Sequence, residues 1–547
     1  MMKIVIVGGV AGGATAATRL RRLNEKDEIV LFERGEYISF ANCGLPYYIG
    51  EVIQERKKLL VQTVAGLSTR YKLDIRVNSE VTAINRDRKT VSVTNKENGE
   101  GYEESFDILI LSPGSKPIVP PIPGIEETKA LFTLRSIPDT DRIKEYVDEQ
   151  KPKRAVVIGG GFIGIEMAEN LRKRNVAVTI VERNNQVMGP VDFEMAAIVH
   201  KELEKNGVSL VLEDGVESFQ NEGTIVKLAS GKEIKTDMII LAIGVVPENT
   251  LAKEAGLELG LRGAIAVTEN LQTSDPSIYA IGDAIQVRDY VNGHETYVPL
   301  AWPANRQGRL IADYINGKNV KYNGTMGTSI VQVFDLTVAA TGNNEKTLQR
   351  LDIPYEVVHI HPANHATYYP GAAALSLKLI FNKETGAIYG AQVVGKSGAD
   401  KRIDVIATAM KGNLTVFDLA DLEIAYAPPF ASAKDPVNVA GYVASNVVNG
   451  EVKTVQWNEI DQLIEQGNVL IDVRNPDEVA KGSIKGSVNI PLDELRDRMD
   501  ELDKTKTIYL SCQIGLRGYI ASRLLEQYGF DVKNLDGGYR TYSDVFC

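Results

Sequence analysis

Three cysteines are the residues of this chain whose type is best suited to redox or sulfur chemistry. Cys43, Cys512 and Cys547 are too few and too far apart in 547 residues for a disulfide framework, and they form no CxxC pair that could bind a metal. We therefore expect an important cysteine of this chain to act as a reactive thiol rather than as a structural crosslink.

Cys43 has the surroundings of a reactive cysteine. Turn-forming and capping residues, among them Ser39 and Asn42, flank it in the segment SFANCGLPYYIG, where a buried, inert cysteine would have apolar neighbours. The thiol precedes a predicted short helical segment, and the positive end of such a helix would lower the thiol pKa and favour the thiolate.

A basic helix face is predicted in the same part of the sequence. The segment ATAATRLRRL places Thr15, Arg19 and Arg22 four and three residues apart, so that they share one face of a helix. Cations beside a reactive thiol suit a substrate that carries phosphates. An exposed, solvated basic face is the alternative interpretation.

Cys512 opens a second reactive segment, Cys512-Gln-Ile-Gly-Leu-Arg517-Gly, which precedes a predicted helix. A cysteine in such a six-residue loop faces a nest of backbone amides, which stabilises a thiolate or a persulfide anion. Arg517 is expected to add positive charge. Cys547 is expected to be a free surface thiol without a role.

Two glycine-rich turns, each between a predicted buried strand and a helix, must position these segments. In the first, Gly8, Gly12 and Gly13 follow the strand KIVIV and Glu33 ends the next strand, while Val10 stands where a second glycine is usual. Such a turn lets helix amides face a pyrophosphate, and the carboxylate binds ribose hydroxyls. The pattern predicts a dinucleotide-binding fold.

The second turn has every residue of the dinucleotide fingerprint: Gly159, Gly161 and Gly164, with Glu182 at the end of the following strand. The two folds lie about 150 residues apart and imply two dinucleotides. The Glu182 carboxylate would repel a 2′-phosphate and favour NADH, while Arg183 beside it leaves NADPH as an alternative.

Bulk composition narrows the function classes. A chain of 547 residues should split into three or four domains, because single cores stop growing near about 250–300 residues. The net charge of -11 and the pI near 5.3 argue against a nucleic-acid partner. Because the sequence has no long apolar run and no signal-like N-terminal segment, we expect a cytoplasmic protein with small-molecule partners and no membrane association.

Several segments resemble known families. The arrangement of the two nucleotide folds resembles the FAD- and NAD-dependent disulfide reductase superfamily. The folds are interleaved with the predicted strands FDILILSPGSKP, TDMIILAIGVVP and SIYAIGDA. Within this superfamily, residues 1–446 are similar to coenzyme A disulfide reductases. The similarity is carried by the segments SFANCGLPYYIGE, RIDV, AYAPPF and KDP. The segment LIDVRNPDEVAKGSIKGSVNIP and the Cys512 loop resemble a rhodanese domain, in which a loop of this length suits sulfane-sulfur transfer.

The resemblance implies the fold class and the domain boundaries. The fold is α/β, with two Rossmann-like dinucleotide-binding domains, an α+β dimerisation domain and a C-terminal α/β rhodanese domain. The expected boundaries are 1–115 and 245–325 for a discontinuous FAD-binding domain, 116–244 for the NAD(P)H-binding domain, 326–446 for the dimerisation domain, 447–455 for a linker and 456–547 for the rhodanese domain.

The resemblance also implies the site residues. Cys43, Cys512 and Arg517 are catalytic, and so are Tyr368 and Tyr426, which match a tyrosine pair that the reductases contribute from the partner subunit of a homodimer. No metal is expected. The residues implied for FAD are Gly8, Val10, Ala11, Gly12, Gly13, Glu33, Arg34, Ser112, Gly114, Asp283 and Ala301. Those implied for NADH are Gly159, Gly161, Ile163, Gly164, Glu182 and Gly244. Those implied for coenzyme A are Thr15, Arg19, Arg22, Ser39, Asn42, Lys72, Lys434 and Asn305, the last standing where some relatives have histidine.

Cys43 has no second cysteine nearby, whereas many members of the superfamily carry two cysteines four residues apart. It must therefore cycle through a sulfenic acid or through a mixed disulfide with a substrate thiol. Our hypothesis is that NADH, through FAD, reduces a Cys43–CoA mixed disulfide. This disulfide forms when Cys43 attacks coenzyme A persulfide or a related polysulfide and hydrosulfide leaves, while the rhodanese domain handles sulfane sulfur.

Three alternatives stay open at the level of sequence. The chain could be a coenzyme A disulfide reductase with a separate rhodanese activity. It could be an NADH oxidase or peroxidase that uses a Cys43 sulfenic acid. From a different class, it could be a redox-sensing protein that holds coenzyme A without turnover.

Overall fold

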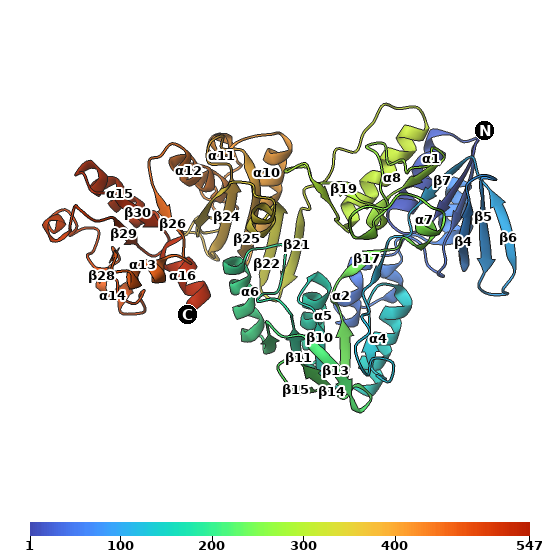
Figure 1. The fold of residues 1–547 in the computed structure, drawn as a ribbon, viewed down its shortest axis with the longest axis horizontal. Coiled ribbons are helices and arrows are strands. Elements are labelled where there is room, and N and C mark those ends of the chain that lie inside the picture. Colours follow the sequence, from blue (N-terminus) through green and yellow to red (C-terminus); the bar gives the residue numbers. More distant parts are fainter. The chain divides into compact units, whose positions relative to one another are not determined.

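The chain forms two units, each of which collects segments that are distant in sequence. The computed structural model describes residues 1–547; one unit consists of Met1–Asn185 and Gly207–Gly327, and the other of Gln186–Asn206 and Thr328–Cys547. Helix α6 (Phe193–Lys205), green in Figure 1, thus belongs to the second unit, whose other elements come from the yellow-to-red part of the chain.

The first sheet of the first unit is parallel throughout, with the strand order β18-β7-β1-β2-β3. The register aligns Lys3 with Glu28 and Val7 with Phe32. Strands that are covered on both faces carry continuous apolar runs, as KIVIV and EIVLF do. The bounds are β1 (Lys3–Val7), α1 (Gly12–Leu23), β2 (Glu28–Phe32), β3 (Asp74–Arg76), β7 (Ile108–Leu111) and β18 (Ile278–Ala280).

The turn between β1 and α1 requires glycine. Gly8 has a φ of 103°, and a Cβ there would lie 2.0 Å from the backbone oxygen of Ser112. A Cβ at Gly13 would lie 1.9 Å from the backbone oxygen of Gly8. Strand, turn and helix therefore approach one another at a distance that only glycine permits.

The second sheet of this unit repeats the plan, with the order β12-β11-β10-β16-β9 and parallel pairing. Its glycine turn joins β10 to α5. The bounds are β9 (Leu131–Phe132), α4 (Ile137–Gln150), β10 (Arg154–Ile158), α5 (Phe162–Lys173), β11 (Ala177–Val181), β12 (Val208–Val211) and β16 (Met238–Leu241).

Smaller sheets and helices complete the first unit. Its smaller strands are β4 (Ser79–Asn85), β5 (Thr90–Asn95), β6 (Gly101–Ser105), β8 (Ser115–Pro117), β13 (Val216–Gln220), β14 (Ile225–Leu228), β15 (Glu233–Lys235), β17 (Val245–Pro247), β19 (Val287–Arg288) and β20 (Glu295–Thr296). Its other helical segments are η1 (Asn42–Gly44), α2 (Leu45–Ile49), η2 (Arg56–Leu59), α3 (Val64–Tyr71), η3 (Asn221–Gly223), α7 (Thr250–Glu254), η4 (Leu261–Gly263), η5 (Gly282–Ala284) and α8 (Ala301–Ile315).

The second unit is built on an antiparallel sheet with the order β21-β22-β25-β24-β23. Every residue of β24 is buried, because this interior strand is covered by neighbouring elements on both faces. The strands are β21 (Ser329–Val333), β22 (Leu336–Gly342), β23 (Glu356–Ile360), β24 (Leu375–Phe381) and β25 (Ile388–Gly395). The helices are α9 (Glu345–Arg350), α10 (Ala399–Lys411), α11 (Val416–Asp421) and α12 (Pro436–Val448).

A parallel sheet with the order β26-β30-β29-β27-β28 forms the C-terminal part of this unit. The strands are β26 (Thr454–Val455), β27 (Val469–Asp472), β28 (Val488–Asn489), β29 (Ile508–Ser511) and β30 (Val532–Leu535). The helical segments are α13 (Ile460–Glu465), α14 (Pro476–Val479), η6 (Met499–Glu501), α15 (Leu516–Gln527) and α16 (Gly538–Phe546). The fold class is the predicted one, with two parallel dinucleotide-type sheets, an α+β module and a C-terminal α/β domain.

The C-terminal domain is packed against the rest of the second unit. Trp457 stacks on Phe193 of α6 with ring centroids 6.2 Å apart. The buried His359 of β23 donates its backbone N–H to the carboxylate of Asp536 at 3.0 Å, and its Nδ1 lies 2.6 Å from the same group. Burial alone would lower the pKa of His359, but the carboxylates of Asp536 and Glu194 raise it to about 9, so the contact is an ion pair at neutral pH.

None of the helices combines the length and the apolar content that a membrane-spanning helix needs.

Candidate functional site

The two glycine turns hold a carboxylate in the same way. Glu33 accepts hydrogen bonds from the backbone N–H groups of Gly9 and Gly35, both at 2.9 Å. Glu182 accepts one from the N–H of Gly160 at 2.8 Å and one from the N–H of Asn184 at 2.9 Å. Each carboxylate thus lies at the mouth of its turn, which is the place for a group that binds ribose hydroxyls.

A cavity of about 420 Å³ opens beside the first turn. Gly8, Glu33 and Arg34 line it together with Glu248, whose carboxylate lies 3.5 Å from the Arg34 guanidinium. Its size and its mixed apolar and polar lining suit the nucleoside end of a dinucleotide.

Unpaired polar atoms in the first unit fit a bound polar cofactor. Tyr297 Oη, Gln307 Nε2 and Asn42 Oδ1 are buried without a hydrogen-bond partner in the chain, and buried polar atoms ordinarily have one. Asp283 accepts from Ser115 Oγ and from the Arg135 guanidinium, each at 3.2 Å. A flavin cofactor has the polar ring, ribityl chain and phosphates that such groups bind.

The other residues predicted to bind the nucleotides lie at the same ends of the parallel strands. Ser112 and Gly114 follow β7, Asp283 lies in η5 after β18, and Ala301 begins α8. Ile163 lies in the first turn of α5, and Gly244 follows β16. Parallel strands bring their carboxyl ends to one edge, so each predicted set is collected at one sheet edge.

Cys43 lies in η1 and is exposed, but its pKa departs from the expectation. Partial desolvation of the sulfur by surrounding chain raises the thiol pKa, and the carboxylates of Glu166 and Asp283 raise it further, against a smaller opposing effect of Arg135. The predicted lowering by a positive helix end is wrong. The following helix, α2, spans only Leu45–Ile49, and desolvation of the sulfur and the two carboxylates act against it.

Two neighbours of Cys43 were missed by sequence reasoning. The Tyr47 hydroxyl donates to Glu166 Oε1 at 3.1 Å. Tyr47 follows Cys43 by four residues, and Glu166 lies two residues beyond Gly164 of the second fingerprint, so both stood beside motifs that were recognised. Their proximity depends on the packing of α2 against α5, which no local pattern reveals.

The basic face of α1 carries less unbalanced positive charge than expected. Arg19 binds Asp313 of α8 through Nε at 2.9 Å and NH2 at 2.7 Å, so its charge is balanced within the chain. Arg22 donates to the backbone oxygen of Thr18 at 3.0 Å. Thr15 donates to Asn305 Oδ1 at 2.7 Å, so two residues predicted to bind coenzyme A contact each other directly.

The remaining residues predicted to bind coenzyme A are distributed over both units. Ser39 and Asn42 precede Cys43 in the first unit, and Ser39 has a left-handed φ of 46°. Lys72 follows α3 with a φ of 50°, and its backbone oxygen accepts from Arg21 at 3.2 Å. Lys434 lies in the second unit, just before α12.

Tyr368 and Tyr426, both in the second unit, form a pair. Their hydroxyl oxygens are 2.6 Å apart, and the two residues are 73% and 47% exposed. The hydrogen bond between the two hydroxyls raises the pKa of Tyr368. Phe430 nearby in sequence is also exposed, so this segment presents aromatic side chains to the surface.

Cys512 follows β29 and is buried at the start of its loop. The backbone of Tyr539 donates to the Cys512 carbonyl at 2.7 Å, which fixes the loop from the side of α16. Arg517 binds Glu478 through both terminal nitrogens at 2.6 Å, and this contact lowers the pKa of Glu478 to about 2. The positive charge expected from Arg517 is therefore balanced by a carboxylate. Cys547 is exposed, with its sulfur 3.9 Å from the Tyr539 hydroxyl.

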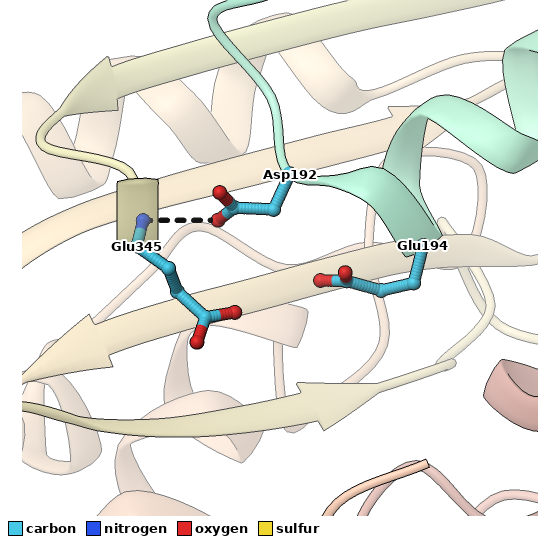
Figure 2. A group of neighbouring side chains, drawn as sticks. All are labelled: Asp192, Glu194 and Glu345. Atoms are coloured by element: carbon cyan, nitrogen blue, oxygen red, sulfur yellow. Dashed lines mark hydrogen bonds between the residues drawn. The ribbon is translucent and has the colours of Figure 1, made fainter. Parts of the chain in front are cut away.

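A buried cluster of carboxylates in the second unit looks, by ligand type, like a cation site. Figure 2 shows Asp192 and Glu194 at the start of α6 facing Glu345 of α9, and one oxygen of each lies within 4.8 Å of the others. The ammonium of the fully buried Lys378 lies among them, 3.0 Å from Asp192 and 2.5 Å from Glu194, and also bonds Glu345. A side chain of the protein therefore supplies the cation that this cluster needs.

The first unit combines two glycine turns with a site that fits a flavin and with the Cys43 thiol. This combination defines a dinucleotide-dependent oxidoreductase. Comparison with known families agrees: the chain belongs to the pyridine nucleotide-disulphide oxidoreductase family, whose pattern matches residues 2–308. The dimerisation domain of that family matches residues 328–436, and a rhodanese-like domain matches residues 456–544. FAD and NAD(H) are the cofactors of this family, as predicted for this chain.

Individual relatives narrow the comparison. The chain is 38% identical over 445 residues to a coenzyme A disulfide reductase of Staphylococcus epidermidis, which covers 81% of this chain and 100% of the relative. It is 63% identical to the reduced CoADR-RHD of Bacillus anthracis, with 100% and 98% of the two chains covered and a TM-score of 0.99. A NAD-dependent persulfide reductase from A. fulgidus is 37% identical, with 99% and 100% covered and a TM-score of 0.92. The family resemblance inferred from the sequence is confirmed.

Proposed function

We propose that this protein is an NADH-dependent reductase that converts coenzyme A persulfide, or a related polysulfide, to hydrosulfide and thiol. The observation that carries the proposal is that one chain contains a solitary exposed thiol, Cys43, in its dinucleotide unit and a rhodanese-type thiol loop at Cys512. The likeness to a persulfide reductase over 99% of the chain supports it.

The reaction balances as coenzyme A persulfide, NADH and a proton giving coenzyme A, hydrogen sulfide and NAD⁺. The sulfur of Cys43 attacks the coenzyme A sulfur of the persulfide, the outer S–S bond breaks and hydrosulfide leaves. The resulting Cys43–CoA disulfide is then cleaved by the two electrons of NADH. Because the dinucleotide unit has no second cysteine, the partner sulfur in this disulfide must come from the substrate.

Bound FAD supplies the two-electron chemistry between NADH and the disulfide. The residues that would hold it are the first glycine turn, Glu33 and Asp283, while the second turn and Glu182 would hold NADH. For coenzyme A, we propose Thr15, Arg22, Ser39, Asn42 and Asn305 in the first unit. Arg19 would contribute only by positioning, since Asp313 already balances its charge.

Assembly and location are part of the proposal. The exposed Tyr368 and Tyr426 would face the Cys43 site of a second copy in a homodimer, where their hydroxyls protonate the departing thiolate. Lys434 belongs to the second unit, as the two tyrosines do, and would bind coenzyme A from that unit. We propose that the dimer works in the cytoplasm.

Reduction of coenzyme A disulfide is the second candidate, because the curated relative with 38% identity bears that name. The test compares NADH oxidation by the purified protein with coenzyme A persulfide and with coenzyme A disulfide at equal concentration. We expect a higher kcat/KM for the persulfide. Higher kcat/KM for the disulfide would favour the second candidate, and turnover of neither would reject both.

Replacing Cys512 with serine tests the role of the rhodanese domain. We expect Cys512→Ser to lose most NADH-dependent sulfide release from polysulfide while keeping turnover of coenzyme A persulfide, because only the first substrate needs the loop to load sulfane sulfur. Sulfide release by wild type, Cys512→Ser and the matched Cys547→Ser variant is the measurement. Unchanged polysulfide turnover in Cys512→Ser would leave the sulfur relay without support.

Replacing Glu182 with glutamine should shift cofactor use toward NADPH. The amide oxygen can still accept from the Gly160 N–H, while the acceptor for Asn184 and the charge that repels a 2′-phosphate are removed. We expect the ratio of kcat/KM for NADPH to that for NADH to rise about tenfold. Glu33→Gln, at the matching carboxylate of the first turn, should leave this ratio unchanged. An unchanged ratio in Glu182→Gln would show that this carboxylate does not face the ribose.

A further inference from the structure

One short segment of the C-terminal domain lies between the Cys512 loop and the dimerisation domain of residues 328–436. This connecting segment, residues 536–540, runs from the end of β30 into the first turn of α16. The dimerisation domain and the C-terminal domain both belong to the second unit. The contacts of the segment on its two sides therefore show how the dimerisation domain can act on the Cys512 loop.

On one side the connecting segment is bonded to the loop. The backbone N–H of Tyr539 donates to the Cys512 oxygen at 2.7 Å, and that of Arg540 donates to the Gln513 oxygen at 2.9 Å. A Cβ at Gly538, whose φ is 64°, would lie 2.4 Å from the Cys512 oxygen and 2.8 and 2.9 Å from two of the loop's backbone nitrogens. The backbone of Gly538 thus packs directly on the loop whose amides are to hold the sulfur.

On the other side the connecting segment is held by His359 of β23. The His359 backbone N–H donates to both carboxylate oxygens of Asp536 at 3.0 Å, and its Nδ1 lies 2.6 Å from Oδ2. A Cβ at Gly537, whose φ is 66°, would lie 2.9 Å from the Cβ of His359. Two consecutive glycines therefore pack on different neighbours, Gly537 on the dimerisation domain and Gly538 on the loop.

A second carboxylate holds the His359 ring in place. Its Nε2 lies 3.0 Å from Oε1 of Glu194 on α6. A neutral imidazole has only one N–H, so the ring donates to Asp536 and Glu194 together only when it is protonated. Burial would lower the pKa of His359, but the two carboxylates raise it to about 9. His359 and both carboxylates are buried, so loss of the ring would leave the Asp536 charge buried without its cation.

We propose that His359 is a positioning residue for the Cys512 loop: by holding Asp536 it sets the connecting segment against the loop. The dimerisation domain is then part of the sulfur-handling site, although His359 contacts neither the thiol nor the substrate. The inference rests on the proposed function for the handling of sulfane sulfur by Cys512.

The first experiment compares turnover of two sulfur substrates in His359→Gln, which removes the positive charge between the two carboxylates. NADH-dependent sulfide release from inorganic polysulfide should fall about tenfold, because small displacements of a reacting group have effects of this size. Turnover of coenzyme A persulfide at Cys43 should stay within about twofold of wild type. The matched control is Lys201→Met, which removes the hydrogen bond from α6 to the Ser543 oxygen at 2.7 Å, in the later part of α16. Both rates should stay within about twofold in this control.

A second substitution should partly restore the first variant. His359→Gln leaves the buried Asp536 carboxylate without a cation, whereas adding Asp536→Asn makes the contact one between two neutral amides. The amide oxygen introduced at position 536 can still accept from the backbone N–H of residue 359. Sulfide release by the double variant should return to within about threefold of wild type. A general loss of stability predicts the opposite, because the effects of two destabilising substitutions add.

The third measurement needs no turnover. Amide hydrogen exchange at Tyr539 and Arg540 reports the two hydrogen bonds that join the connecting segment to the loop. Exchange at both amides should be about tenfold faster in His359→Gln than in wild type and unchanged in Lys201→Met. Peptides that cover β1 and α1 should exchange equally in all variants, which controls for the fold of the first unit.

Three results would overturn the proposal. They are unchanged polysulfide turnover and unchanged exchange in His359→Gln, an equal loss in Lys201→Met, and a double variant that is worse than His359→Gln alone. If His359→Gln does not fold, Asp536→Asn decides, because it weakens the same contact and should also speed exchange at Tyr539 and Arg540. If wild type releases no sulfide from polysulfide, the function proposed for the Cys512 loop fails, while the exchange experiment still decides whether His359 positions the loop.

Discussion

Replacing Cys43 with serine should reduce NADH-dependent sulfide release from coenzyme A persulfide by at least about 10³-fold in kcat, because the nucleophile of the reaction is removed. The serine hydroxyl is similar in size but forms no disulfide. The other two cysteines, Cys512 and Cys547, belong to the second unit, so the dinucleotide unit has no replacement thiol.

The controls separate loss of the thiol from loss of the fold. Cys43→Ser should still bind FAD, and NADH should still bleach the flavin absorbance, because the glycine turns, Glu33 and Glu182 are untouched. Full sulfide release by Cys43→Ser would contradict the proposed function. Oxygen consumption by wild type without added thiol, lost in Cys43→Ser, would instead favour the oxidase alternative with a Cys43 sulfenic acid.

Features set by local backbone geometry could be predicted from the sequence. The first turn needs glycine at positions 8 and 13, because backbone atoms lie where a Cβ would be. The glycines in the sequence therefore indicate the turn directly. Glu33 and Glu182 close their strands because the βαβ unit has a nearly fixed length. The Cys512 loop was recognisable for the same reason, since a cysteine, a short loop and a helix are contiguous.

Features set by long-range packing could not be predicted in this way. Arg19 was expected to present a free charge, but its partner Asp313 lies 294 residues away on α8. The charge of Arg517 is likewise balanced by Glu478, which lies 39 residues before it. The pKa of Cys43 was predicted in the wrong direction because local sequence shows the helix that follows the thiol. It shows neither the distant chain segments that desolvate the sulfur nor the carboxylate of Glu166 on α5.

Replacing Lys378 with methionine should destabilise the second unit by about 3–5 kcal/mol, since it removes the cation that bonds three carboxylates and leaves Glu194 with His359 alone. Lys378 is fully buried on β24 and bonds Asp192, Glu194 and Glu345, which come from α6 and α9. Methionine fills a similar volume, so the lost charge dominates the effect. Lys383→Met, just beyond the end of β24, is the matched control; its ion pair with Glu356 is exposed and should contribute less than about 1 kcal/mol.

The pH dependence of this difference follows from the shifted groups. Burial would raise the pKa of Glu194, but Lys378 and His359 hold it far below its usual range, so its contribution is present above about pH 4.5 and is lost as the pH falls through the lowered pKa. Burial would lower the pKa of Lys378, but the carboxylates raise it, so its contribution persists at least up to pH 10.5. Wild type and Lys378→Met should therefore differ most between these limits, and the difference should shrink in acid, where the unpaired carboxylates of the variant become protonated.

The difference in free energy of unfolding between wild type and Lys378→Met can be measured by urea unfolding. The fluorescence of Trp457 reports unfolding of the second unit. Only two tryptophans occur, and Trp457 stacks on Phe193 of α6, next to Glu194, whereas Trp302 belongs to the first unit and can be replaced by phenylalanine. A Lys378→Met variant as stable as Lys383→Met at pH 7 would contradict the prediction. His359, whose Nε2 lies 3.0 Å from Glu194, would then be a sufficient cation for the cluster without Lys378.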